Sequence, residues 1–489
     1  MAETNPTFHQ VPVRAASGKE VAAEKGHLFG LGTATALVVG SIVGVGIFNL
    51  PMSLAGYGPI SLVSMALTTV GAVALALLFA SLSRRLPADG GPYAYARVAF
   101  GNGLGFANAW SYWITAWAGN AAIAVGWVLY VEHFVNKGQN TLGSIVLVLL
   151  GLWIPAAVNL SGVKNTGGMQ NVTTILKFVP LVFMSTVGLF FIHSANFHPW
   201  NVSGSSTMAA IGGAMAIALF SYLGVETASV VAGKVDDPVR NIPRATVLGT
   251  LACAVVYMLS LTAVFGIVPN GQLQNANAPF SDAMNAIFGG SWAGNLMALL
   301  VIVSGIGALN GWTMVTAEMP LAAANDGLFP KRFASISKAG VPAFGIVVST
   351  LIASVAIVIN YLGSSGGTVF LTLVLMSGIT AAIPYAFSAL AQMKWRIADH
   401  RGMHTPRFAR DMIVAVLALV FSVFFIVYSR NTGNPWWIYW APFYMTAIAL
   451  LVGIPVYRSQ RDRMTAPPAV PPYLDSDGGS ADRGPSAAA

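Results

Sequence analysis

The chain has 489 residues, of which 55% are hydrophobic and only 9% are charged. Soluble domains carry about 25% charged residues, so this composition excludes a soluble protein and indicates one that crosses a membrane many times. The net charge of +8 comes from lysines and arginines that lie mainly in the tails and alternate loops described below, so it does not indicate nucleic-acid binding. The single cysteine, Cys253, excludes disulfides and cysteine-based metal sites within the chain.

Hydropathy predicts twelve membrane-spanning segments, since a helix needs about 20 mostly apolar residues to cross a bilayer. They lie between a polar N-terminal tail, residues 1–28, without a cleavable signal peptide, and a C-terminal tail, residues 458–489, that we expect to be disordered. The predicted segments are 29–50, 60–83, 104–131, 143–160, 169–192, 209–231, 246–268, 292–319, 342–361, 368–392, 412–428 and 435–457. An even number of spans places both termini on the same side of the membrane.

Basic residues predict which side that is. Of the 25 lysines and arginines, 22 lie in the two tails and in alternate loops, whereas Lys137 and Arg430 lie in the opposite loops and Lys177 lies within a span. Cytoplasmic loops carry the excess of positive charge, so we expect both tails in the cytoplasm. Adding or removing one span would destroy this alternation, which supports the count of twelve.

Two predicted spans carry glycines that would interrupt a helix. Segment 1 contains GSIVGVGIFNLP, Gly40 to Pro51, and we expect its break at Gly44–Val45–Gly46. Segment 6 has the corresponding interruption at Ser221–Gly224. The two lie five spans apart and therefore run in opposite directions, as inverted repeats of five helices require.

Such paired breaks are the best sequence indicator of a transporter's binding site. A half-helix N-terminus exposes N–H groups that suit a carboxylate, and a half-helix C-terminus exposes carbonyls that accept from an ammonium. Two breaks at the middle of the membrane would therefore bind a zwitterion through the backbone. The alternative is that Gly40 and Gly44 only let two helices pack closely.

Four motifs follow one another in an order typical of a known family. With GSIVGVGIFNLP (40–51), DGGPYAYARVAFG (89–101), FSYLGVETASVVAGKVDDPVRNIPRAT (220–246) and GWTMVTAEMPLAAANDGLFPKRF (311–333), the chain resembles the amino acid-polyamine-organocation (APC) superfamily. Within it, the chain is similar to the basic amino acid/polyamine antiporters, especially the arginine/agmatine and arginine/ornithine exchangers.

The resemblance implies an all-α integral membrane protein with a LeuT-like fold. Inverted repeats 29–192 and 209–392 would form a ten-helix core with discontinuous helices 1 and 6, and residues 393–457 would add two peripheral helices. It implies a secondary active transporter of the plasma membrane, without cofactor or metal, that exchanges arginine, ornithine or lysine for a related amino acid or amine by alternating access. The alternative is a proton-coupled amino acid symporter without obligatory exchange. Many family members are homodimers.

The resemblance also carries over substrate-binding residues. Segment 1 would hold the substrate's carboxylate and amino group, segment 6 would offer its carbonyls to the amino group, and Phe220 would gate the site. Trp312, on segment 8, would stack on the cationic side chain of the substrate. The alternative is that Trp312 is an ordinary tryptophan of the membrane interface. The expected substrate-binding residues are Ile42, Gly44, Val45, Gly46, Asn120, Phe220, Leu223, Trp312 and Ser377. Val45 replaces a small polar residue of the family, so a hydroxyl contact is lost.

Three further residues are candidates for gating and coupling. Tyr112 matches a tyrosine of the family's middle gate, and Glu226 matches a glutamate implicated in proton sensitivity, or else forms a structural hydrogen bond to segment 1. Some relatives have a lysine at the position of Lys177, and in those relatives the lysine occupies the space that a sodium ion takes in others. Lys177 would exchange a proton, hold the carbonyls of segment 1 as a fixed cation, or snorkel toward the cytoplasm.

Other classes fit less well. A membrane enzyme would need a cluster of His, Asp, Glu or Ser at catalytic spacing, and an ATP-driven pump would need a phosphate-binding loop. Glu318 and Asp326 flank the inner end of segment 8, where we expect a solvated face.

Overall fold

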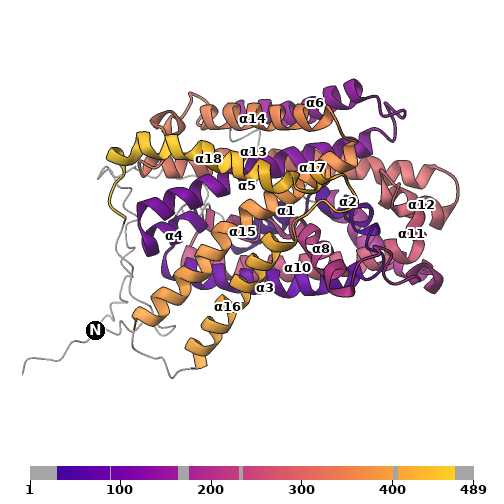
Figure 1. The fold of residues 1–489 in the computed structure, drawn as a ribbon, viewed down its shortest axis with the longest axis horizontal. Helices are drawn as coiled ribbons and strands as arrows, with labels where there is room; N and C mark the ends of the chain where they lie inside the picture. The colour runs from indigo at the N-terminus through magenta and orange to yellow at the C-terminus, as the bar shows by residue number, and fades with distance from the viewer. Residues whose placement is uncertain (1–29, 89, 163–175, 231–234, 400–405, 468–489) are drawn as a thin grey trace, which may run out of the picture.

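The computed structural model describes residues 30–88, 90–162, 176–230, 235–399 and 406–467. The predicted tail of residues 1–28, most of the C-terminal tail, and the loop residues Lys164, Lys234 and Arg401 lie outside these ranges. Within them the chain is helical, and Figure 1 shows long helices running side by side. Helix α4 lies at one end of this bundle, and α11 and α12 lie at the other end.

Ten helices of the described part are long and apolar enough to cross a membrane. They coincide with ten of the predicted segments. The other two segments appear as shorter apolar helices, Leu176–Phe191 and Thr207–Tyr222. The first is short because its predicted segment begins before the described residues, and the second because its helix is interrupted after Tyr222.

The helical elements have the following bounds. They are α1 Leu31–Ile42, α2 Val45–Ala55, α3 Ser61–Arg85, α4 Pro92–Phe100, α5 Asn102–Val131, α6 Thr141–Leu160, η1 Val187–Phe191, η2 Ser194–Phe197, α8 Thr207–Ala218, η3 Leu219–Tyr222, α9 Thr227–Val230, α10 Pro238–Ile267, α11 Asn270–Leu273, α12 Pro279–Phe288, α13 Trp292–Asn325, η5 Lys331–Ala334, α14 Ala343–Tyr361, α15 Gly366–Ala398, α16 Pro406–Tyr428, α17 Trp436–Tyr439, α18 Ala441–Gln460 and η6 Arg461–Arg463.

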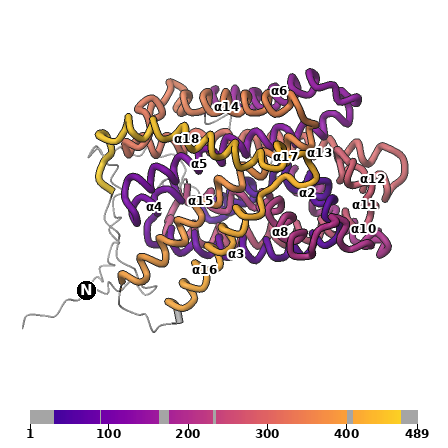
Figure 2. The backbone as a smooth tube through the Cα atoms, viewed as in Figure 1, coloured from indigo at the N-terminus to yellow at the C-terminus, as the bar shows by residue number. Residues whose placement is uncertain are grey.

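Helix α5 forms the centre of the bundle. Nearly all of its residues from Gly105 to Tyr130 are buried, and it packs along α13 and α15. Helices α6, α14, α16 and α18 expose many large apolar side chains, which is the surface that a lipid-facing helix presents. The backbone trace in Figure 2 shows α6 and α14 together along one edge and α16 along the opposite edge. The residues that face the centre therefore lie on α5 and its immediate neighbours.

Segment 1 is broken as predicted, but slightly earlier in the chain. Helix α1 ends at Ile42, and Val43 and Gly44 have extended backbone conformations. The Val43 N–H still donates to Val39 O at 2.8 Å, as in a helix, and the extended backbone at Val43 ends the first half-helix. Helical geometry returns at Val45, so Val45 and Gly46 belong to the first turn of α2 rather than to the break.

Segment 6 is also broken, slightly later than predicted. Ser221 lies in the 3₁₀ helix η3, and the chain then turns through residues 223–226 before α9 begins. Gly224 has φ +107°, a conformation that favours glycine. A Cβ atom there would also lie 3.0 Å from the carbonyl carbon of Ser41. Gly224 thus lets the two breaks approach each other.

Candidate functional site

A small cavity lies where the two broken segments meet α5 and α13. Its volume is about 20 Å³, enough for about one water molecule. It is lined by Ser41, Ile42, Gly44, Gly46, Gly119, Ile123, Phe220, Ser221, Leu223 and Trp312. Six of the predicted substrate-binding residues are among them. In this conformation the cavity is too small for an amino acid, so side chains must move before one can bind.

Four lining residues were not predicted. Ser41 and Ser221 are direct neighbours of predicted residues in the breaks. Gly119 and Ile123 are four residues apart on α5 and therefore share one helix face. The prediction named the next residue on α5, Asn120, which does not line the cavity in this conformation.

The N-terminus of α2 faces this cavity without a cap. Its N-cap residue, Gly44, has no side chain and therefore gives the first turn of the helix no side-chain acceptor. The N–H groups of a first turn also have no acceptor within the helix. Gly44 and Gly46 both line the cavity, so this partially positive helix end adjoins the empty space. The arrangement suits an anionic group such as a carboxylate.

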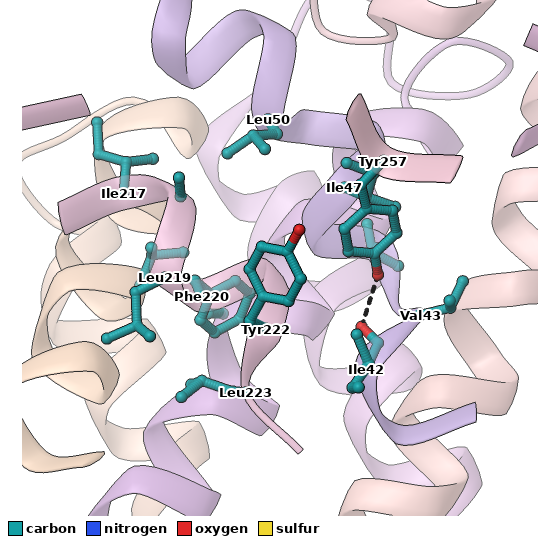
Figure 3. Close-up of a cluster of buried hydrophobic side chains, with 14 of the residues drawn as sticks. Ile42, Val43, Ile47, Leu50, Ile217, Leu219, Phe220, Tyr222, Leu223 and Tyr257 are labelled. Atoms are coloured by element: carbon teal, nitrogen blue, oxygen red, sulfur yellow. Dashed lines mark hydrogen bonds between the residues drawn. The ribbon is translucent and has the colours of Figure 1, made fainter. Parts of the chain in front are cut away.

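The C-terminal carbonyls of α1 are already bonded. The Lys177 ammonium donates to Gly40 O at 2.8 Å, the Trp312 indole N–H donates to Ser41 O at 3.1 Å, and the Tyr257 hydroxyl donates to Ile42 O at 2.9 Å. Figure 3 shows the last of these bonds, with Tyr222 nearby. Each of these three carbonyls therefore already accepts one hydrogen bond from another segment in this conformation, and each retains a second lone pair.

Lys177 is fully buried and bonded to the broken segment. This geometry contradicts the snorkelling alternative. It matches the alternative in which the lysine holds carbonyls of segment 1. Burial of the whole side chain also explains why the amine needs such a partner, since an unpartnered ammonium in an apolar interior is very costly.

Phe220 covers the N-terminus of α2. A Cβ atom built on Gly46 would lie 3.0 Å from Phe220 Cδ1 and 3.1 Å from Cε1, so only glycine leaves room for the ring. The Phe220 ring meets Phe370 edge-on at a centroid distance of 6.2 Å. Trp312, bonded to Ser41, forms another wall of the cavity. Two aromatic rings therefore enclose the small space.

Glu226 is held between two tyrosines. The Tyr112 hydroxyl donates to Glu226 Oε1 and the Tyr385 hydroxyl donates to Oε2, both at 2.7 Å, and Glu226 is fully buried. The structure therefore does not support the alternative of a hydrogen bond to segment 1. Tyr385, on α15, was not predicted, and no local pattern in the sequence identifies it.

Three predicted substrate-binding residues do not line the cavity. Asn120 donates to Thr313 Oγ1 at 3.1 Å, while its own Oδ1 is buried without a partner among the described residues. Ser377 donates to Thr115 O at 3.0 Å. The Val45 side chain packs against Gly305 on α13, because a Cβ atom added to Gly305 would lie 2.6 Å from Val45 Cγ2.

The C-terminal end of α13, at Asp326, carries an ion pair instead of the expected solvated face. Arg97 and Asp326 form a salt bridge at 2.6 Å, and the Tyr93 hydroxyl donates to Asp326 at 2.9 Å. Arg97 also donates to the hydroxyl and the carbonyl of Thr465, which follows α18. The solvated-face expectation was wrong for Asp326 because α4 and the C-terminal segment pack against it.

Comparison with known proteins identifies the family of the chain. Residues 29–453 match the family model described as amino acid permease. The chain is 31% identical over 369 residues to the putrescine transporter PotE of Escherichia coli (strain K12), covering 75% of this chain and 83% of that protein. It is 32% identical over 431 residues to a putative arginine/ornithine antiporter of Bacillus subtilis (strain 168), covering 80% of this chain and 90% of that one. A cadaverine/lysine antiporter of Escherichia coli (strain K12) is 28% identical over 397 residues.

The many apolar helices and the family of its relatives define the chain as an integral membrane protein of a class of transporters, not of enzymes. It belongs to the amino acid permease family of the APC superfamily.

Proposed function

We propose that the protein is a secondary active transporter that exchanges a basic amino acid, such as arginine, ornithine or lysine, for a related amino acid or amine. It would do so by alternating access in the plasma membrane, with twelve spans, a LeuT-like arrangement of two inverted five-helix repeats within residues 29–392, and both termini in the cytoplasm. The observation that carries the proposal is the uncapped N-terminus of α2, which adjoins a cavity walled by Phe220 and Trp312.

The substrate's head would bind at the two breaks. Its carboxylate would accept from the first-turn N–H groups of α2, beside Gly44 and Gly46. Its amino group would donate to carbonyls of segment 6 at Phe220 and Leu223, and to the second lone pairs of the last carbonyls of α1, each of which already accepts from one side chain. The Phe220 carbonyl accepts from Leu223 N at 3.3 Å and retains a second lone pair for the substrate.

The basic side chain would lie against the aromatic walls. A guanidinium or ammonium over the face of a tryptophan gains roughly 0.5–2 kcal/mol, and Trp312 is the tryptophan of the cavity. The buried and unpartnered Oδ1 of Asn120 is one residue from Gly119 and would accept from the same cation after a small rotation of its side chain. Neither contact adds a fixed negative charge, so the cation can be released.

Transport requires the cavity to open alternately toward each side. Phe220 must leave its place over Gly46 before a substrate can enter, because the present space holds about one water molecule. Glu226, bonded to Tyr112 on α5 and Tyr385 on α15, would tie the break of segment 6 to those helices in the closed state. Rupture of these bonds would accompany opening.

Proton-coupled uptake without obligatory exchange is the second candidate. One observation favours it: Glu226 and Lys177 are both fully buried, and their hydrogen-bond partners among the described residues are uncharged. Each group could therefore gain or lose a proton when its partner moves.

Reconstituted liposomes distinguish the two functions. If the protein is an exchanger, uptake of labelled arginine requires arginine, ornithine or an amine inside the liposomes and is unaffected by an imposed proton gradient. If it is a symporter, empty liposomes accumulate arginine when the outside is acidified. Competition of unlabelled amino acids and polyamines with labelled arginine then defines the substrate class. Failure of every basic compound to compete would refute the proposed specificity.

A further inference from the structure

Helices α2 and α5 touch beyond the cavity, on the side of α12. The cavity residues Gly119 and Ile123 of α5 continue on the same face as Gly126 and Tyr130, at helical spacing. On α2, Asn49 follows Gly46 by three residues and therefore lies on the same face of the helix, nearer its C-terminal end. Figure 1 shows that α12 covers this end of the bundle. A substrate that passes between the cavity and this end must separate the two helices.

Two side chains join α2 to α5 across this path. Asn49 donates from Nδ2 to Gly126 O at 3.1 Å, and the Tyr130 hydroxyl donates to Phe48 O at 2.9 Å. Each bond runs from a side chain of one helix to a carbonyl of the other. Asn49 and Tyr130 are fully buried.

The close approach depends on a glycine. A Cβ atom at Gly126 would lie 2.8 Å from Asn49 Nδ2 and 2.8 Å from a ring carbon of Phe370. The space between the helices is therefore filled at this level by the amide of Asn49 and the ring of Phe370. The amide oxygen of Asn49, Oδ1, is buried without a hydrogen-bond partner among the described residues. That oxygen would be hydrated if α2 moved away, which favours the separated state.

Helix α12 adds to the same contact. The Phe280 N–H donates to the Tyr130 hydroxyl at 3.4 Å, and the Phe280 ring packs edge-on against Phe48 at 5.0 Å. Tyr130 thus accepts from α12 and donates to α2, so one hydroxyl connects three elements. We propose that Asn49 and Tyr130 form a latch that closes the cavity toward the α12 side, and that they are positioning residues for alternating access.

This inference rests on the proposed transport function, but its test needs no substrate. A reporter cysteine replaces the cavity residue Ile123 in a Cys253→Ala background, and a membrane-impermeant thiol reagent is applied from the face that carries α12. The test variants are Tyr130→Phe, which removes one hydroxyl, and Asn49→Ala. The matched control is Tyr361→Phe, because Tyr361 is buried on α14 and its hydroxyl has no hydrogen-bond partner among the described residues.

We expect each latch variant to raise the rate of labelling about fivefold, the factor that corresponds to loss of one ordinary hydrogen bond from the closed state. Tyr361→Phe leaves the rate unchanged. Labelling from the opposite face falls or stays constant, because the latch lies on one side of the cavity only. An unchanged rate in Tyr130→Phe, or an equal rise from both faces, overturns the proposal, since general loosening of the fold would admit reagent from both sides.

A failure of the proposed function gives a different result. If the protein transports no basic amino acid, the liposome uptake experiments fail while the labelling difference persists. If the latch is wrong, uptake by the unmodified protein is normal while the labelling rates of latch and control variants coincide.

Discussion

Gly46 gives the sharpest test of the proposed binding site. A methyl group at this position would lie 3.0 Å from Phe220 Cδ1, about 0.5 Å closer than the lower end of ordinary carbon–carbon contact. In the closed conformation Gly46 belongs to the first turn of α2 and Phe220 meets Phe370, so the methyl group opposes the return of the Phe220 ring over the site after a substrate has entered. Overpacking of this kind costs about 1–3 kcal/mol. The methyl group would also occupy space where a carboxylate must approach the N–H groups.

We therefore expect Gly46→Ala to raise the KM for arginine about 5- to 150-fold, the range that corresponds to this cost. Uptake of labelled arginine into liposomes measures it, with the unfolding temperature as a check on the fold. Gly32→Ala in α1 is the matched control, because nothing lies within 4 Å of a Cβ atom there. Gly46→Leu should abolish transport without preventing membrane insertion. A KM for Gly46→Ala equal to that of the control, or normal uptake by Gly46→Leu, would refute the site.

Three further predictions concern charged groups. Replacing sodium by choline should leave arginine uptake unchanged, since the Lys177 ammonium already bonds Gly40 O; a strong sodium requirement would contradict this. Burial raises the pKa of Glu132, the residue that follows α5, above its value of about 4.3 in the unfolded chain. The free energy of unfolding therefore decreases as the pH rises from about 4.3 through the higher pKa of the folded state. Glu132→Gln should therefore increase the unfolding temperature, relative to the unmodified protein, more at pH 7.5 than at pH 4, and an equal difference at both pH values would count against this reasoning. Asp326→Asn should destabilise the protein by about 3 kcal/mol because it leaves the buried Arg97 without its ion pair, whereas Thr465→Ala should cost about 1 kcal/mol. Unfolding temperatures in the reverse order would show that the ion pair is not the main contact.

The membrane class and the positions of the helices could be predicted because both depend on local composition. Each of the ten long apolar helices of the described residues overlaps a predicted segment, although several extend beyond it. The two breaks were located to within about two residues, since the glycines that interrupt a helix lie at the interruption itself, as Gly44 and Gly224 do. The four motifs also identified the family before any three-dimensional information was used.

The site itself could be predicted only in part. The residues of the breaks, such as Ile42, Gly46 and Phe220, follow from the chain's own interruption and do line the cavity. On the continuous helix α5 the prediction named Asn120, whereas Gly119 faces the cavity. One residue along a helix turns the side chain by about 100°, so neighbouring residues of α5 face different directions, and the sequence does not show which of them lines the cavity in a given conformation.

The sequence by itself determined that this is a membrane protein with two broken helices and an amino acid permease's motifs, because hydropathy, glycine placement and motif order are properties of short stretches of chain. Only the tertiary structure decided which groups occupy the broken ends. Lys177, Tyr257 and Trp312 are far apart in the chain, yet all three bond consecutive carbonyls of α1. Partners of this kind depend on how separate helices rotate and pack against one another, and no short stretch of sequence contains that information.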